Sequence, residues 1–147
     1  MTKNNMQLEV PVLLFTLGDQ EYAMLIEDVL EVAAMVEITH VADPRPEILG
    51  VVNRHGTVLW MLDLRRIFGQ SAQSVDITTL FIVAQRGAHQ LGLVVDEVRQ
   101  VEYVDLSKLQ TSARATELIH GILSHGERLI QLLALSPLLE RYAPVAD

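Results

Sequence analysis

Apolar residues along the chain come in short runs that are separated by turn-forming residues. The runs are rich in Val, Ile, Leu and Phe, which favour strands, and glycine with polar neighbours stands between the two members of each pair. This pattern predicts a mainly β chain with four hairpins. The paired segments are 12–17 with 21–24, 51–52 with 58–62, 79–84 with 90–95, and 122–123 with 129–135.

Part of this pattern occurs twice. Residues 27–32 resemble residues 96–101 at an offset of 69, and residues 50–56 resemble residues 121–126 at an offset of about 70. A period of this length is outside the range of about 20–50 residues that solenoid repeats have. The duplication therefore predicts two related half-modules.

The polar, unpatterned segment 69–76 separates the two copies. We expect one domain over residues 1–147, with a first half at about 10–69 and a second half at about 77–140. Because a module of roughly 70 residues is small for an independent core, the halves are expected to pack together, and strands could pass from one half to the other.

Three short segments have helical features. Residues 26–34 place apolar side chains at i, i+3, i+4 and i+7 behind two acidic residues, which is typical of a short amphipathic helix. Residues 64–68 and 137–142 are further helix candidates, and Ser136 is the expected N-cap of the second.

Composition and charge exclude several classes of function. The 147 residues carry 11 Lys and Arg against 19 Asp and Glu, a net charge of −8, so a polyanion such as nucleic acid would be repelled. The chain has no cysteine, which excludes disulfides, thiolate catalysis and sulfur-ligated metals. Half of the residues are hydrophobic and the mean hydropathy is +0.27, which provides apolar surface for a core or for partners.

No apolar run approaches the roughly 20 residues that a membrane-spanning helix needs. The first ten residues also lack the apolar stretch of a secretion signal. We therefore expect a cytoplasmic protein without direct membrane insertion.

Residues 48–69, with the sequence ILGVVNRHGTVLWMLDLRRIFG, resemble the most characteristic segment of the CheW family of chemotaxis adaptors. In that family the segment is roughly G-[VI]-[VIL]-N-L-R-G-x-[VI]-[VIL]-P-[VI]-[VIL]-D-L-R-x-x-F-G. Residues 15–23 match the family's upstream F-x-L-G-x-x-x-Y-A, and residues 91–98 match its downstream L-G-L-V-V-D-x-V. The fragments occur in the family's order, and the resemblance extends from about Leu14 to Leu139.

The resemblance implies two five-stranded β-barrels of SH3-like shape that share a hydrophobic core, with a few short helices. It also implies a function, because CheW-like adaptors couple the cytoplasmic tips of chemoreceptors to the regulatory domain of the histidine kinase CheA. Such an adaptor catalyses no reaction, needs no cofactor or metal, and is recruited to receptor complexes at the inner membrane. The alternative is a diverged scaffold that serves another chemosensory pathway, such as pilus motility, or that self-associates to fill array positions.

Asn53, Arg54, His55 and Gly56 occupy the family's N-L-R-G loop, in which the arginine is associated with receptor and kinase contacts. His55 stands at the arginine position. Neutral histidine offers one donor and one acceptor, whereas arginine offers a charged fork of five donors, so a partner carboxylate would be bound less firmly. Arg54 is not assumed to replace that arginine, because adjacent hairpin residues can point to different sides. The alternative is that Asn53 and Gly56 only build the turn and that Arg54 and His55 are solvated.

Six further positions are candidates for partner contacts. Those that match family contact positions are Val29, Glu31, Leu80 and Phe81, and the repeat counterparts on the later segment are Val98 and Val101. For the apolar members the alternative is burial in the core, more so for Phe81 than for Leu80. Exposure of an apolar patch around them would favour the binding role.

Two residues replace prolines that are common in the family. Trp60 lies in a predicted strand, and Leu25 precedes the first predicted helix. An inward Trp60 would enlarge the core, whereas an outward indole would be an interface anchor.

Asp63 and Asp96 each end an apolar strand, and a pair of carboxylates could suggest acid–base catalysis. Because Arg65 is close to Asp63, we expect backbone capping or ion pairing instead. A third hypothesis is a small hydrolase or ligand sensor that uses His55, His125 and Asp63, which requires these side chains to converge in one cleft.

Overall fold

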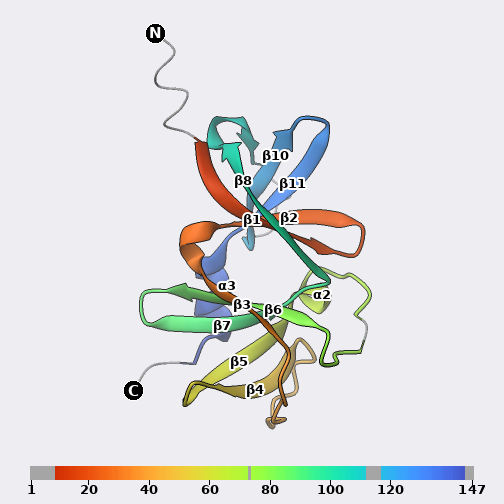
Figure 1. The fold of residues 1–147 in the computed structure, drawn as a ribbon, viewed down its shortest axis with the longest axis vertical. Helices are drawn as coiled ribbons and strands as arrows, with labels where there is room; N and C mark the ends of the chain where they lie inside the picture. The colour runs from red at the N-terminus through yellow and green to blue at the C-terminus, as the bar shows by residue number, and fades with distance from the viewer. Residues whose placement is uncertain (1–8, 73, 112–116, 145–147) are drawn as a thin grey trace.

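The computed structural model describes residues 9–72, 74–111 and 117–144, and most of these residues are in strands (Figure 1). The strands are β1 (Glu9–Leu17), β2 (Gln20–Leu25), β3 (Val29–Ala34), β4 (Ile48–Arg54), β5 (Thr57–Asp63), β6 (Leu80–Arg86), β7 (His89–Val94), β8 (Glu97–Asp105), β9 (Leu109–Gln110), β10 (Ile119–His125) and β11 (Arg128–Leu133). The helical segments are the 3-10 turns η1 (Ile26–Asp28) and η2 (Leu106–Lys108) and the α-helices α2 (Leu64–Ile67) and α3 (Leu135–Tyr142).

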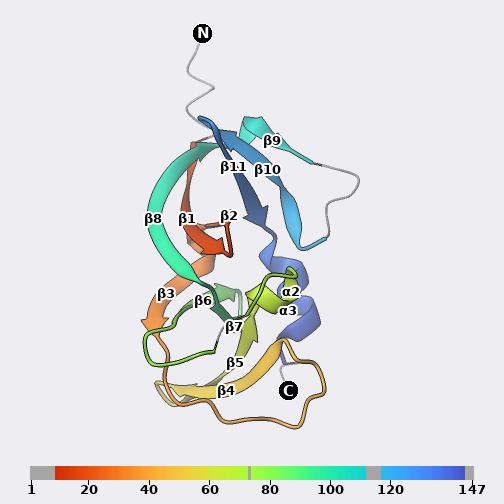
Figure 2. The same ribbon diagram turned by 90° about the vertical axis from the view of Figure 1, so that its right-hand side faces the viewer.

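The strands form two sheets that lie one above the other as SH3-like barrels (Figures 1 and 2). The upper barrel has the strand order β8-β1-β2-β11-β10-β9, and the lower barrel has the order β3-β6-β7-β5-β4. The mainly β fold with two related subdomains is confirmed. The upper barrel gains a sixth strand, the two-residue β9, beyond the five that were expected.

The two barrels do not coincide with the two halves of the sequence. The upper barrel combines the hairpin β1–β2 with β8, β10 and β11, and the lower barrel combines β3, β4 and β5 with the hairpin β6–β7. The two strand orders become the same when β1 to β5 are matched with β6, β7, β8, β10 and β11. Each half therefore gives its first hairpin to the barrel that the rest of the other half builds. The parallel pairs β2–β11 and β5–β7 join the halves inside each sheet.

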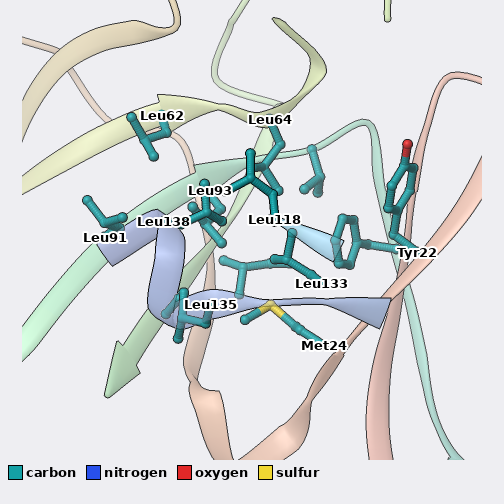
Figure 3. Close-up of a cluster of buried hydrophobic side chains, with 14 of the residues drawn as sticks. Tyr22, Met24, Leu62, Leu64, Leu91, Leu93, Leu118, Leu133, Leu135 and Leu138 are labelled. Carbon is teal, nitrogen blue, oxygen red and sulfur yellow. The ribbon is translucent and has the colours of Figure 1, made fainter. Parts of the chain in front are cut away.

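Three groups of buried apolar side chains hold this arrangement together. One fills the interior of each barrel, and the largest lies between the barrels. This shared core, which the sequence predicts, takes Phe15 and Met24 from the upper barrel and Ile82 and Leu93 from the lower one. Figure 3 shows side chains of β11 and α3 among those of the lower barrel, with labels on Leu133, Leu135 and Leu138 and on Leu62, Leu64, Leu91 and Leu93.

All four predicted hairpins are present. Each turns on two residues, and each turn contains a glycine with positive φ. In the β4–β5 turn both residues have positive φ, 52° at His55 and 82° at Gly56, which is the pattern of a type I′ turn. This conformation is tolerated by histidine better than by most bulky residues.

Two details of the helix predictions are wrong. Residues 26–34 form only the single turn η1 before strand β3, in which half-buried and exposed residues alternate. Pairing of β3 with β6 overrides the helical spacing, because a half-buried edge strand satisfies the same apolar residues. Helix α3 begins at Leu135 with Ala134 as a cap that makes no side-chain bond, so Ser136 lies inside the helix and is not its N-cap.

Candidate partner-binding site

The β4–β5 turn is built by its own side chains and backbone. The Asn53 carboxamide oxygen accepts a hydrogen bond from the Gly56 N–H at 2.9 Å, which closes the turn. This leaves His55 exposed at the tip of the lower barrel. Asn53 and Gly56 thus have a structural role, and His55 is the side chain of the loop that points a polar ring at solvent.

Arg54 has a partner within the chain. Its guanidinium binds Glu31 with two contacts, from Nε to Oε1 at 2.8 Å and from Nη2 to Oε2 at 2.6 Å. The hydrogen bond from Arg54 holds the pKa of the Glu31 carboxyl below its ordinary value. Since β3 and β4 are the two outermost strands of the lower sheet, the pair bridges the seam of that barrel. The structure thus brings together two candidate residues that are 23 positions apart.

The upper barrel has a larger charge cluster, which joins β10 and β11 to β2 and β8. Arg128 binds Glu21 with Nη2 to Oε1 at 2.6 Å and Glu102 with Nη1 to Oε1 at 3.3 Å, and His125 Nε2 lies 3.0 Å from the same Glu102 oxygen. Hydrogen bonding to Glu21 raises the pKa of Arg128, and it lowers that of Glu21. His125 is therefore part of this charge cluster.

Strand β3 presents valine to the junction between the barrels. Val29 pairs with Ala84 and Val32 pairs with Ile82, both of which belong to the shared core. Directly paired residues lie on the same face of a sheet, so these valines point toward the junction. Val29 is half-buried against the shared core, whereas 39% of Val32 is exposed.

Strand β8 likewise presents valines to the junction, from the side of the upper barrel. Val98 pairs with Phe15 and Val101 pairs with Leu13, again residues of the shared core. Val98 is half-buried, and 47% of Val101 is exposed. The four residues Val29, Val32, Val98 and Val101 are called the junction strip below.

The two halves of the junction strip are related to each other by the internal repeat. An offset of 69 takes Val29 to Val98 and Val32 to Val101. Val32 was not among the candidate residues. The repeat contained the signal that could have identified it, since Val101 was selected and Val32 is its counterpart.

The last two candidates lie on β6. Phe81 is 2% exposed and packs in the interior of the lower barrel with Met61 and Val83, so it belongs to the core. Leu80 is half-buried at the start of β6, where it pairs with Ala34. It lies on the same face as Ile82, the partner of Val32, whereas Phe81 lies on the opposite face.

Trp60 and Leu25, the two residues at positions where the family commonly has proline, both pack against buried apolar side chains. Trp60 is half-buried and packs against the shared core, which fits the inward alternative. Leu25 ends β2 and packs against the interior of the upper barrel.

The two strand-end carboxylates are held by one arginine, as the ion-pair interpretation predicts. Asp63 caps α2 by accepting from the Arg65 N–H at 3.0 Å, and its two oxygens accept from Arg65 Nε at 2.8 Å and Nη2 at 3.0 Å. Asp96 accepts from Arg65 Nη1 at 3.2 Å. Both carboxylates are thus engaged by Arg65.

The residues of the hydrolase hypothesis do not converge. His55 precedes β5 and Asp63 ends it, and a strand of seven residues separates its ends by about 20 Å. His125 lies on the other barrel, bound to Glu102. Among the described residues no group of three or more His, Asp or Glu could hold a metal ion.

The profile of the CheW-like domain matches residues 11–143. The chain belongs to the CheW-like family. It is 33% identical over 132 residues to the chemotaxis protein CheW of Klebsiella aerogenes, covering 86% of this chain and 80% of that protein. It is 28% identical over 131 residues to the chemotaxis protein CheW of Helicobacter pylori, covering 86% and 79%.

A solved structure supports the CheW-like fold. The scaffolding protein TtCheW from Thermoanaerobacter tengcongensis matches with a TM-score of 0.78 at 24% identity, over 86% of this chain and 89% of that chain. In the part of the CheW-like chain that the structure describes, no helix is long and apolar enough to cross a membrane.

Proposed function

We propose that this CheW-like protein is a non-catalytic adaptor that couples chemoreceptors to a CheA-type histidine kinase, and that it is recruited to receptor complexes at the inner membrane. The observation that carries the proposal is the junction strip, where two valines of each barrel face the shared core and one of each pair, Val32 and Val101, remains exposed. Exposed apolar side chains arranged over two strands are typical of a protein-binding surface.

The shape of the strip favours a helical partner. Its four valines come from two strands that cross the junction between the barrels, and the buried side chains of the shared core lie beneath them. An amphipathic helix binds such an apolar surface through its apolar stripe. We assign the receptor to the junction strip, as the partner that would supply such a helix.

The kinase regulatory domain is assigned to a separate face around the β4–β5 turn. There Arg54 and Glu31 hold the seam of the lower barrel, and His55 is exposed beside them. An adaptor needs two separate faces, because it must hold both partners at the same time.

Binding measurements with charge-inserting variants test the proposal. Val101→Glu places a carboxylate on the exposed part of the strip and is expected to weaken binding of a purified receptor cytoplasmic fragment about tenfold or more, measured by calorimetry. The matched control is Val58→Glu, since Val58 is exposed on β5 outside the strip. If neither the receptor fragment nor the kinase regulatory domain binds the unmodified protein at high micromolar concentration and low salt, the adaptor function is refuted.

A second candidate function is a diverged scaffold of another chemosensory pathway, such as pilus motility, or a self-associating array component. The observation that favours it is His55, which offers no permanent charge at the family's arginine position. Sedimentation of the protein alone distinguishes self-association from binding of the two partners.

A further inference from the structure

Both strands that carry the junction strip begin at a carboxylate that an arginine holds. Asp96 directly precedes β8, and Asp28 directly precedes β3. Arg65 binds Asp96 and Arg86 binds Asp28. The contacts around Asp96 are called the β8 latch, and the contacts around Asp28 are called the β3 latch.

The β8 latch joins parts of both barrels. Arg65, on α2 of the lower barrel, binds Asp63 through two contacts and Asp96 through one at 3.2 Å. Asp96 also accepts from the Gly18 N–H at 2.6 Å, and its own N–H donates to the Thr16 carbonyl at 3.1 Å. The start of β8 is thereby fixed both to α2 and to the first hairpin. Only 4% of the Arg65 side chain is exposed, so solvent screens these charges little.

The β3 latch holds the corresponding point of the other half but lies closer to solvent. Arg86, at the end of β6, binds Asp28 from Nε to Oδ1 at 3.2 Å and from Nη2 to Oδ2 at 2.7 Å. Its Nη1 donates to Ser136 Oγ on α3 at 2.6 Å. Asp28 is buried, but 42% of the Arg86 side chain is exposed. Water and salt can therefore compete for this arginine.

The two latches are not copies of each other. When the halves are matched, Arg65 corresponds to Ser136 and Asp96 corresponds to Glu27. The arginine thus comes from a helix in one latch and from a strand in the other. Two different sets of residues hold the same point in each half, the start of the strand that crosses the junction.

We propose that Arg65 and Arg86 are positioning residues for the junction strip. Through Asp96 and Asp28 they fix the starts of β8 and β3, with the β8 latch rigid and the β3 latch releasable. Release of the β3 latch displaces Val29, the next residue after Asp28, while the β8 side of the strip stays in place. The effect on a partner rests on the proposed function, whereas the effect on the strands does not.

Hydrogen exchange tests the effect on the strands without any partner. Arg86→Met is expected to raise amide exchange about tenfold in residues 29–34 and to leave residues 97–105 unchanged. Arg65→Met is expected to do the reverse. If Arg65→Met does not fold, Asp96→Asn, which removes the charge but keeps an acceptor, replaces it. A variant that only lowered overall stability would raise exchange in both strands together, and this outcome overturns the proposal.

Binding of the receptor cytoplasmic fragment tests the consequence. Arg86→Met is expected to weaken affinity about 5- to 20-fold at a temperature where the variant is fully folded, and Arg86→Lys, which keeps the charge, is expected to recover part of it. The control is Arg141→Met on α3, which removes the exposed ion pair between Arg141 and Glu117.

The two kinds of failure are distinguishable. If exchange in β3 rises and the affinity does not change, the positioning role is overturned although the adaptor function stands. If the unmodified protein binds no receptor fragment, the proposed function fails, and the exchange pattern alone decides whether the latches fix the strands.

Discussion

Arg54 and Glu31 form a two-contact ion pair across the seam between the outermost strands of the lower barrel, with contacts at 2.6 and 2.8 Å. The pair engages the guanidinium of Arg54 within the chain. A charge next to the turn is therefore not free for a partner merely because the sequence places it there. The exposed polar ring of the loop belongs to His55.

Replacement of Glu31 should change how the stability of the protein depends on pH. Hydrogen bonding to Arg54 holds the pKa of Glu31 below its ordinary value of 4.5 in the folded state. Its contribution is therefore present above about pH 4.5 and is lost as pH falls through the lower folded-state pKa. We expect Glu31→Gln to have a lower Tm than the unmodified protein at pH 7 and the difference to shrink toward pH 3. Glu127→Gln, in the exposed β10–β11 turn, is the control, and a constant difference across this range contradicts the prediction.

Arginine at position 55 should strengthen the contact at the β4–β5 turn. A charge-assisted hydrogen bond to a partner carboxylate would improve binding of the kinase regulatory domain by on the order of 1 kcal/mol. Because His55 has a positive φ, the substitution is also expected to lower stability slightly. Calorimetry of His55→Arg measures the first effect and thermal unfolding the second.

The matched control for this substitution is His120→Arg, at an exposed position of β10. It adds the same charge to the upper barrel, away from the β4–β5 turn. Equal gains from both variants would indicate a general effect of charge, and no gain from His55→Arg would favour the diverged-scaffold alternative.

The shared core should make the two barrels unfold together. Leu123 lies in the interior of the upper barrel, and Trp60, the only tryptophan, lies in the lower one. Leu123→Ala is expected to destabilise the protein by about 3 kcal/mol and to lower the urea midpoint that Trp60 fluorescence reports. Circular dichroism should give the same midpoint. A Trp60 transition that stays where it was in the unmodified protein would show that the barrels are independent.

One glycine should tolerate no side chain. Gly50 has a φ of 140°, and a Cβ there would lie 2.3 Å from the Thr39 carbonyl oxygen. We expect Gly50→Ala to cost about 2–4 kcal/mol in chemical denaturation. Gly126→Ala is the comparison, because Gly126 has a φ of 65° with open space around it and should cost about 1 kcal/mol. Similar costs at the two positions would contradict the argument from the close approach.

Local features of the fold could be predicted from the sequence because they depend on neighbouring residues. The four hairpins follow from apolar runs with glycine between them, and the duplication follows from similar residues at a constant offset. The exchange of hairpins between the halves was allowed but not determined, because β2 pairs with β11 through contacts that no local pattern records. Residues 29–34 were assigned to a helix because their spacing fits both a helix and a half-buried strand.

The candidate site could be predicted only in part. The turn residues and the strip valines of β8 were identified by resemblance and by repeat, but the sequence could not show that Arg54 binds Glu31. The repeat matches Val32 with Val101, but only the folded chain shows that Val32 is exposed. The role of Arg86 in holding Asp28 depends on residues 58 positions apart, which only the folded chain brings together.

The exchange of hairpins has a consequence for synthesis. The hairpin β1–β2 pairs with β8 and β11, and β11 ends at Leu133, near the C-terminus. The β1 edge of this hairpin stays uncovered until β8 (Glu97–Asp105) has been made, and its β2 edge stays uncovered until β11 has been made. Its unpaired backbone groups could meanwhile pair with another nascent chain. Stop codons placed between β7 and β11 should therefore yield products that aggregate or bind chaperones.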